Sequence, residues 1–223
     1  MQTLDQSSGV RPPPSDFRPP TYPARPINGG PLSVARPKPG RRSLSPESQW
    51  FYEPKYNGWR AMVHVPTGAM FNRHNEPLTI QSEFSEALVY LRRLSYEWLD
   101  CEALDRRHNV GRGALIVLDS PSLADLTYVR RRNILERDFL MISRQSVPED
   151  NGVYLPMSMA IGDYQEAFWN VLRRDNAEIK QRCHLTEDFF EGTVAKLGSS
   201  VYPIQLRSAK EEFAGWMKHR WTF

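Results

Sequence analysis

The sequence is poor in cysteine and lacks long apolar segments. Its only two cysteines are Cys101 and Cys183, and neither belongs to a Cys-x-x-Cys pair. This excludes a disulfide framework and a paired-cysteine metal site, and a reducing, cytoplasmic location is expected. No apolar run reaches the roughly 20 residues that a helix needs to cross a bilayer. The N-terminus has neither the basic nor the apolar part of a secretory signal, so we expect no membrane partner. We also expect a monomer.

The net positive charge of the chain lies in its N-terminal part. The net charge is +3, yet residues 1–46 carry seven basic and two acidic residues, which gives +5. The remaining residues carry 22 basic and 24 acidic residues, which gives −2. Any nucleic acid bound by this larger part must therefore contact locally clustered cations.

Residues 1–46 are rich in proline and poor in apolar side chains. They hold 11 of the 18 prolines. Proline fixes φ and removes backbone donors, so we expect a largely disordered arm with polyproline II character. The arm is either a linker or a basic segment that contacts phosphates.

Residues 47–223 are expected to form one folded domain of mixed secondary structure. Apolar patterns predict strands at 50–53, 60–65, 69–73, 98–104, 114–119, 153–155 and 193–197. Helical spacing of apolar residues predicts helices at 82–93, with Ser82 as a possible N-cap, at 126–138 and at 163–174. Because strands and helices do not alternate regularly, the domain is predicted to be α+β with mainly antiparallel sheets.

The segment from Glu53 to Arg60 reads Glu-Pro-Lys-Tyr-Asn-Gly-Trp-Arg and places Lys55 between a carboxylate and a glycine. A lysine in this setting can be a nucleophile that attacks a phosphate and holds the product covalently. It can equally be an ordinary surface lysine in a turn. The local sequence alone favours the surface interpretation, so the rest of the chain must decide.

Seven short segments occur in the order of a known signature. They are Lys55-Tyr56-Asn57-Gly58-Trp59-Arg60, Arg73-His74-Asn75, Leu99-Asp100-Cys101-Glu102, Val117-Leu118-Asp119, Arg131-Arg132-Asn133-Ile134-Leu135, Glu191-Gly192-Thr193-Val194-Ala195-Lys196 and Trp216-Met217-Lys218-His219-Arg220. Together they resemble the motifs of the nucleotidyltransferase (adenylation) domain of ATP-dependent polynucleotide ligases, a superfamily that includes mRNA capping enzymes. The resemblance runs from about Trp50 to the end of the chain.

The resemblance implies a fold and a reaction. The fold would consist of two mainly antiparallel sheets flanked by helices, as in ATP-grasp-like domains. Lys55 would attack the α-phosphate of ATP, release pyrophosphate and carry AMP as a covalent adduct. The AMP would then pass to a 5′-phosphate, and a 3′-hydroxyl would seal the break.

The resemblance also implies a role for each motif residue. Glu53 would lie on the adenine side, Leu118 would pack on the base, and Glu102 would contact the ribose hydroxyls. Arg60 and Arg73 would reach ribose or phosphates. Lys196 and Lys218, followed by Arg220 in place of a lysine, would neutralise charge on the α-phosphate. Mg²⁺ would be held by Glu191 first and Glu102 second.

The substrate implied is nicked or broken nucleic acid. DNA is slightly favoured, because the segment around Lys55 looks closer to DNA ligases. Asn57 stands where most ligases have aspartate, and this change favours RNA ligases slightly. A GTP-using capping enzyme and a non-catalytic module that binds nucleic acid or a partner and keeps the fold are further alternatives.

The chain ends at Phe223, shortly after the last motif. DNA ligases and capping enzymes continue into an OB-fold domain that orients pyrophosphate and clamps the substrate. We therefore expect no OB-fold domain here, and a separate protein is a candidate to supply its role. Removal of residues 1–46 is predicted to weaken nucleic-acid binding while sparing adenylylation of Lys55.

Leu118 generates a first testable prediction. The family often has phenylalanine at this position, and leucine packs on adenine without offering a π-face. Leu118→Phe is therefore expected to bind ATP more tightly, by about 0.5–1.5 kcal/mol in an ATP titration. An affinity no tighter than that of the parent chain would contradict the prediction.

Overall fold

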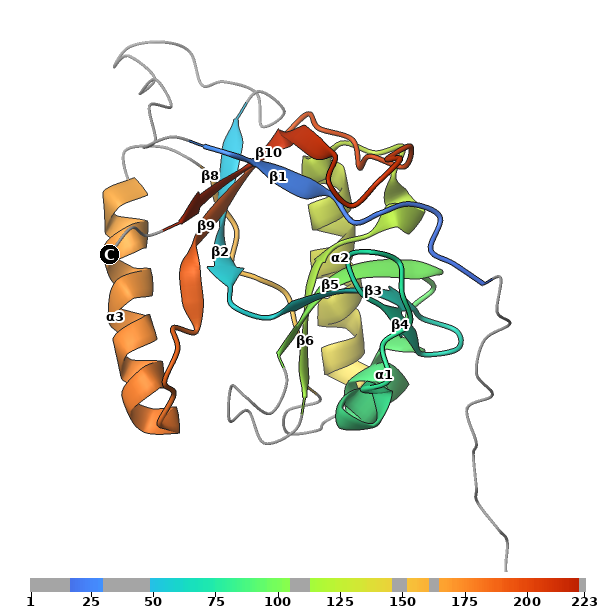
Figure 1. Ribbon diagram of the computed structural model, residues 1–223, viewed down its shortest axis with the longest axis horizontal. Coiled ribbons are helices and arrows are strands. Elements are labelled where there is room, and N and C mark those ends of the chain that lie inside the picture. The colour runs from blue at the N-terminus through green and yellow to red at the C-terminus, as the bar shows by residue number, and fades with distance from the viewer. Residues whose placement is uncertain (1–16, 30–48, 105–112, 146–151, 161–164, 221–223) are drawn as a thin grey trace, which may run out of the picture.

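The computed structural model describes residues 17–29, 49–104, 113–145, 152–160 and 165–220. These residues form two five-stranded sheets with helices around them (Figure 1). The fold prediction is confirmed, because six of the eight strand pairs are antiparallel and two are parallel. No helix in the described ranges is long and apolar enough to cross a membrane.

The first sheet brings together strands from both ends of the chain. Its order is β1-β10-β9-β2-β8, with β1 parallel to β10 and the other neighbours antiparallel. The strands are β1 Arg25–Asn28, β10 Glu212–Arg220, β9 Phe190–Leu197, β2 Trp50–Tyr56 and β8 Met159–Ala160. Helix α3, Gln165–Cys183, packs Phe168 and Leu172 against this sheet.

The second sheet contains the larger apolar core. Its order is β4-β3-β5-β6-β7. The strands are β4 Ala69–Phe71, β3 Trp59–His64, β5 Trp98–Leu104, β6 Ala114–Asp119 and β7 Val153–Tyr154. The core joins these strands to two helices, α1 Ser85–Leu91 and α2 Tyr128–Gln145. Cys101 is fully buried in this core and packs there as a small apolar residue.

Short 3-10 turns precede two of these elements. One turn spans Gln81–Phe84 before α1, and the other spans Pro121–Leu123 after β6. Phe84 is the N-cap of α1, so the predicted cap at Ser82 is wrong. The large side chain of Phe84 enters the core, and this packing fixes the start of the helix without a side-chain cap.

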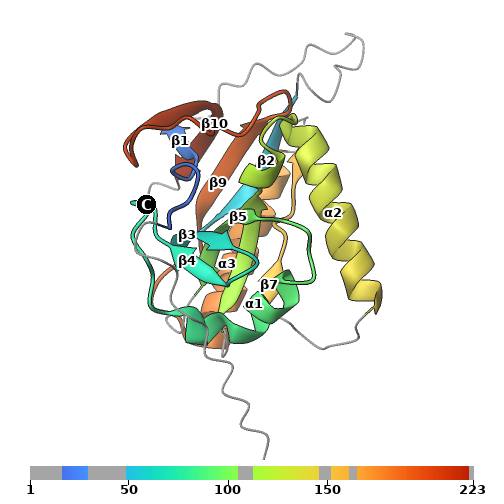
Figure 2. The same cartoon turned by 90° about the vertical axis from the view of Figure 1, so that its right-hand side faces the viewer.

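A connection of two residues joins the two sheets. β2 belongs to the first sheet and β3 to the second, and only Asn57 and Gly58 lie between them. A Cβ atom at Gly58 would lie 2.7 Å from the carbonyl oxygen of Ala103, so glycine lets the strands approach. The chain thus turns from one sheet to the other directly after Lys55 (Figure 2).

The segment 17–29 is ordered, although it lies within the range 1–46 that was predicted to be a disordered arm. β1 pairs with β10, and Phe17 stacks on Trp98 with ring centroids 5.5 Å apart. The prediction of disorder is therefore wrong for these residues. Strand pairing and aromatic burial offset the entropy of ordering the segment, and composition does not reveal such distant contacts. The rest of the arm lies outside the described residues.

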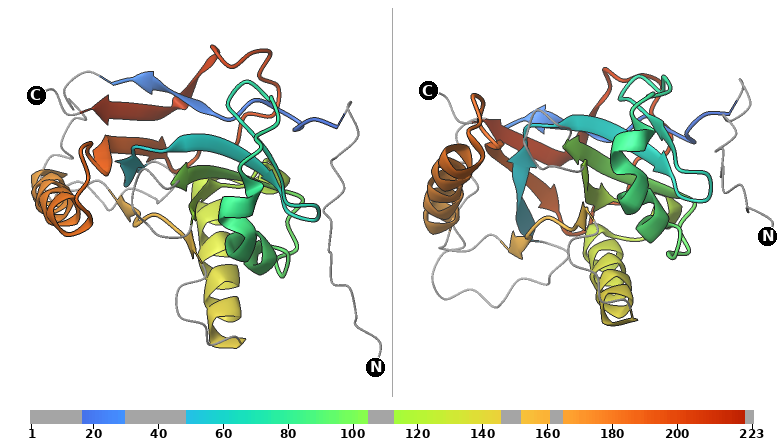
Figure 3. Two further views of the ribbon diagram at one scale, coloured as in Figure 1. Left: turned by 60° about the horizontal axis from the view of Figure 1, so that its bottom comes forward. Right: turned by 90° about the horizontal axis from the view of Figure 1, so that it is seen from below.

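Helix α3 lies against the first sheet, whereas α1 and α2 both pack on the core of the second sheet (Figure 3). All three were predicted, and α3 extends nine residues past its expected end at 174. The predicted N-cap Asp163 lies outside the described residues. Strands β1, β8 and β10 were not predicted. The runs of four and two residues in β1 and β8 are too short for an alternating pattern to be recognised.

The basic run of α2 is used inside the protein. Arg131 is fully buried, and its Nε and one terminal nitrogen donate to the Asp119 carboxylate at 2.7 and 2.9 Å. Arg132 donates to Glu136 at 2.6 Å and to the Pro156 carbonyl at 2.5 Å. Arg131 and Arg132 are thus ion-pair partners inside the protein.

The buried Arg131–Asp119 pair generates a prediction about stability. Burial alone would raise the pKa of the Asp119 carboxyl, but Arg131 outweighs burial and lowers it. Arg131→Met would leave that carboxylate buried and unpaired, and we expect a loss of about 3–5 kcal/mol in the free energy of unfolding. Urea denaturation measures the loss.

Arg130→Met is the matched control, because Arg130 is the exposed neighbour on the same helix. It should change the free energy of unfolding by less than about 0.5 kcal/mol. Equal effects of the two substitutions would contradict a structural role for Arg131.

Candidate active site

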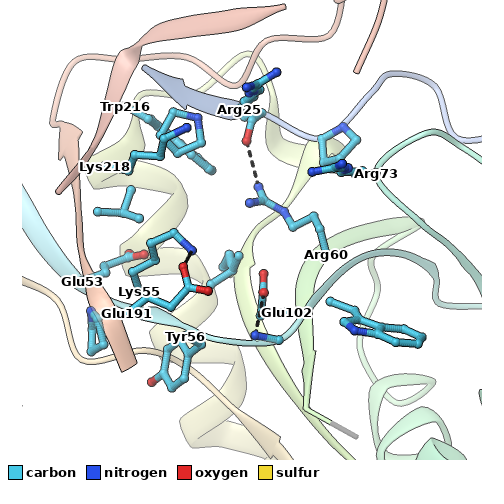
Figure 4. Close-up of a pocket in the computed structure, with 18 of the residues that line it drawn as sticks. Arg25, Glu53, Lys55, Tyr56, Arg60, Arg73, Glu102, Glu191, Trp216 and Lys218 are labelled. Carbon is cyan, nitrogen blue, oxygen red and sulfur yellow. Dashed lines mark hydrogen bonds and ion pairs between the residues drawn. The ribbon is translucent and has the colours of Figure 1, made fainter. Parts of the chain in front are cut away.

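A cavity of about 760 Å³ opens between the two sheets. The first sheet contributes residues of β1, β2, β9 and β10, and the second contributes residues of β3, β5 and β6. Figure 4 shows side chains from both walls directed into this space. The cavity lies where β2 passes into β3, so the strand connection itself forms part of the lining.

Every site residue predicted from the sequence lines this one cavity. They are Glu53, Lys55, Arg60, Arg73, Glu102, Leu118, Glu191, Lys196, Lys218 and Arg220. Residues separated by up to 167 positions are therefore gathered at one place. The role of each residue toward a ligand stays a prediction.

Lys55 and Glu191 face each other on paired strands. The Lys55 Nζ lies 2.5 Å from a carboxylate oxygen of Glu191, and the Arg220 Nε lies 3.3 Å from the same oxygen. Lys55 pairs in register with Gly192, whose φ is +143°. A Cβ atom there would lie 1.9 Å from the His219 carbonyl oxygen, so the glycine permits the approach of β10.

Glu53 and Lys196 form a buried pair at the floor of the cavity. Each side chain is about 1% exposed, and the Lys196 Nζ lies 2.8 Å from a Glu53 oxygen. Lys196 also donates to the Leu118 carbonyl at 2.7 Å, and the Tyr128 hydroxyl donates to Glu53 at 2.6 Å. The charge of Lys196 is therefore compensated within the protein before any ligand arrives.

Arg60 is fixed by partners on three segments. It forms a bidentate pair with the buried carboxylate of Asp100, which also accepts a bond from the Tyr202 hydroxyl at 2.5 Å. The terminal nitrogen that donates to Asp100 also donates to the Ala24 carbonyl, at 3.1 Å. The N-terminal segment thus helps to orient a cavity residue.

Trp216 belongs both to the core and to the cavity lining. It is 1% exposed and packs with Ala24 and Tyr202. Its ring faces two cations, with the Lys196 Nζ 4.1 Å and the Arg60 guanidinium carbon 5.6 Å from the centroid. These cation–π contacts favour the observed positions of both charges.

Glu102 lies on the wall formed by the second sheet. One carboxylate oxygen accepts a bond from the Gly58 amide at 3.1 Å. Burial raises the pKa of its carboxyl to about 7, although Arg60, Lys55 and this amide each act in the opposite direction. Glu102 is therefore able to change its charge near neutral pH.

Three cations of the lining are weakly held or unpaired. The Lys218 ammonium has neither a hydrogen bond nor an ion pair with the described residues, and burial followed by the charge of Arg25 lowers its pKa. Arg25 lies 3.8 Å from Glu212, and Arg73 donates to the His74 ring at 3.0 Å but has no ion pair with the described residues. These side chains give the cavity an excess of positive charge suited to phosphates.

The donor set is compatible with a magnesium ion held together with a phosphate ligand. The described residues contain no cluster of three or more His, Cys, Asp or Glu side chains that would hold a metal alone. Mg²⁺ in nucleotide sites takes one or two protein carboxylates and completes its shell with phosphate oxygens and water. Glu191 and Glu102 provide such carboxylates at the cavity.

The sequence patterns missed the N-terminal part of the lining. Pro23, Ala24, Arg25 and Pro26 border the cavity, together with the exposed Trp59. The tripeptide Arg-Pro-Ile offers no periodicity, and its prolines favoured an interpretation as an arm. The pairing of β1 with β10 is a long-range contact that no local signal announces.

No protein-family model and no curated protein sequence matches the chain. Solved structures do. The ligase domain of M. tuberculosis LigD superposes with a TM-score of 0.54 at 20% identity, over 90% of this chain and 59% of that one. The Chlorella virus DNA ligase-adenylate gives 0.54 at 15% identity, over 90% and 69%. A mycobacterial DNA ligase D complexed with ATP and MES gives 0.51 at 20% identity, over 90% and 60%.

The chain therefore has the fold of the nucleotidyltransferase domain of DNA ligases. The resemblance drawn from the seven motifs is confirmed for the fold. The chain spans about 59–60% of the length of the LigD structures that it matches.

Glu102 generates a prediction about pH. Its carboxyl has a higher pKa in the folded protein, about 7, than in the unfolded chain, so the folded state binds the proton more tightly. This contribution to stability is complete below about pH 4.5 and is lost as the pH rises to about 7. Glu102→Gln removes the ionisation, and its stability relative to the parent chain should rise by about 1–3 kcal/mol between pH 5 and pH 8.

Urea denaturation at the two pH values measures this difference. Glu76→Gln is the control, because Glu76 is exposed and lies outside the cavity lining. A Glu102→Gln effect that does not change with pH would contradict the raised pKa.

Proposed function

We propose that this protein is an ATP-dependent DNA ligase that acts through a covalent lysyl-AMP intermediate. The observation that carries the proposal is the cavity in which Lys55 faces Glu191 and all ten predicted site residues meet. The fold shared with DNA ligases supports it. DNA is the favoured substrate, as the sequence around Lys55 already suggested.

Lys55 is the nucleophile in the first step. Its ammonium group must lose a proton before attack, and the Glu191 oxygen at 2.5 Å is placed to accept it. The neutral amine then attacks the α-phosphorus of ATP. A nitrogen–phosphorus bond forms, the bond from the α-phosphorus to the bridging oxygen breaks, and its electrons leave with pyrophosphate.

The surrounding residues bind and orient the nucleotide. Arg60 reaches the ribose or phosphates from a fixed position, because Asp100 and the Ala24 carbonyl hold its guanidinium. Lys218 has no ion pair with the described residues, so its charge is available to phosphate oxygens. Leu118 and Tyr56 provide apolar lining against which a base can pack.

Glu191 and Glu102 are the residues that would hold Mg²⁺. A bound Mg²⁺ supplies a positive charge that offsets the negative charge of the phosphates. Glu191 is the better candidate, since its carboxylate stands beside Lys55 and is partly exposed. Glu102 is the second, and it is the residue proposed to accept bonds from the ribose hydroxyls.

The later steps transfer AMP to a 5′-phosphate and join it to a 3′-hydroxyl. The described residues account for the first step, and the later steps require a nucleic acid to reach the same lysine. RNA is the alternative substrate, because Asn57 stands where most ligases have aspartate. The Asn57 amide is bonded to the Asp188 carbonyl at 3.0 Å, which shows that a neutral side chain is accommodated here.

Covalent labelling tests the proposed function. The full chain is incubated with α-labelled ATP and Mg²⁺ and then denatured, and the label is expected to stay on the protein. Lys55→Ala should abolish labelling, a loss of at least about 1,000-fold, because no other nucleophile takes its place. Lys55→Arg keeps the charge and should be equally inactive.

Labelling with GTP, and sealing of nicked duplexes that carry DNA or RNA at the break, separate the related activities. Arg207→Ala is the matched control, because Arg207 is an exposed cation outside the cavity lining. Unlabelled parent protein, or equal label on Lys55→Ala, would remove the ligase mechanism. It would leave a non-catalytic binding module as the interpretation.

A further inference from the structure

The N-terminal strand carries a cation into the cavity from outside the seven motifs. Arg25 lies on β1, 30 residues before Lys55, in a segment whose composition indicated an arm. It lines the cavity together with its neighbours Ala24 and Pro26. Figure 4 shows Arg25 at the same end of the cavity as Lys218.

The guanidinium of Arg25 is weakly held by the protein. It lies 3.8 Å from a Glu212 carboxylate oxygen and 3.4 Å from the Lys210 carbonyl, both beyond the distance of a strong hydrogen bond. Its side chain is 44% exposed. The donors of Arg25 are therefore available to a ligand at little cost, in contrast to those of Arg60.

Arg25 and Lys218 act on each other through space. Their strands are paired, since β1 runs parallel to β10 and the Gly29 amide donates to the Lys218 carbonyl at 3.1 Å. The positive charge of Arg25 lowers the pKa of Lys218, after the larger effect of burial. Glu212 acts on both cations, but it lies 3.8 Å from Arg25 and its effect on the pKa of Lys218 is smaller than that of Arg25. Two neighbouring cations that one carboxylate offsets only in part form a favourable place for phosphate oxygens.

The cavity lining as a whole contains more basic than acidic side chains. It contains seven lysine and arginine side chains and three glutamates. Glu53 is matched by Lys196, and Glu191 is matched by Lys55 and Arg220. The excess charge therefore remains with Arg25, Lys218 and Arg73, away from the lysine that attacks.

We propose that Arg25, together with Lys218, binds the β- and γ-phosphates of ATP and thereby the pyrophosphate that leaves. This inference rests on the proposed function. Attack by Lys55 on the α-phosphorus requires the leaving group to point away from the lysine. Cations that are not paired with Glu191 are suited to receive it, and a guanidinium binds such oxygens through two parallel bonds.

The proposal changes the expectation for the N-terminal segment. Deletion of residues 1–46 was predicted to spare adenylylation, because the whole range was taken as an arm. The deletion would remove Arg25 from the cavity and the Ala24 carbonyl from Arg60. We now expect it to impair adenylylation, and deletion of residues 1–16 alone to have little effect.

Point substitutions test the proposal without removing the strand. The ligands are AMP and an ATP analogue with a methylene group between the α- and β-phosphorus, which prevents transfer; each is titrated by calorimetry with Mg²⁺. Arg25→Ala should weaken binding of the analogue by about tenfold and that of AMP by less than about twofold. Arg25→Lys should show an intermediate loss for the analogue. Inhibition of labelling by pyrophosphate should weaken in parallel.

Arg18→Ala is the matched control, because Arg18 is exposed in the same segment but does not line the cavity. It should bind both ligands as the parent chain does. Equal losses for AMP and the analogue in Arg25→Ala would overturn the proposal, as would unchanged affinity for the analogue. A loss confined to nicked DNA would assign Arg25 to nucleic acid and also overturn it.

The two proposals fail in different ways. The contrast between the analogue and AMP is a binding measurement and needs no transfer to Lys55. Absence of label on the parent chain would remove the ligase reaction while leaving this contrast intact. Normal labelling without the contrast would remove only the role of Arg25.

Discussion

The ammonium group of Lys196 links the two sheets. Lys196 lies on β9 of the first sheet, and its Nζ donates across the cavity floor to the Leu118 carbonyl of the second. Burying this charge is costly, and the cost is offset by the Glu53 carboxylate and by the face of Trp216. The spacing of the cavity walls therefore depends on a charged group that is itself part of the lining. A lysine that the motifs assign to the ligand also holds the site in shape.

Charge compensation divides the cavity into two regions. At the floor, each cation has a carboxylate partner, as in the pairs that hold Arg60 and Lys196. Such groups cost little reorganisation when a ligand binds, because their positions are already fixed. Among the described residues, Arg25 is paired weakly with Glu212, at 3.8 Å, and the Lys218 ammonium has no hydrogen bond or ion pair. Glu212 offsets their mutual repulsion only in part, so this end of the cavity is suited to an anionic ligand.

The sequence predicted the site better than it predicted the limits of the folded domain. Motif order identified ten lining residues, because most of the motifs lie on strands that border the cavity. The strong apolar patterns of β5 and β6 also gave the central strands of the second sheet. The strand β1 could not be predicted, because the segment around it is rich in proline. Its partner strand is also distant in the sequence: Arg25 pairs with Glu212, 187 positions later. Local composition indicates how much conformational entropy a segment loses when it becomes ordered. Tertiary contacts decide whether this loss is offset.

Strand β1 pairs with β10 and is the outermost strand on this side of the first sheet. An unpaired β10 would expose its backbone groups at the edge of the sheet, and β1 covers them. The same strand places the Ala24 carbonyl on Arg60 and the Arg25 side chain beside Lys218. A segment that closes a sheet edge is held by backbone bonds, and these do not depend on its side chains. Its side chains are therefore available to the cavity, and Arg25 places one of the basic residues of the N-terminal region in the cavity lining.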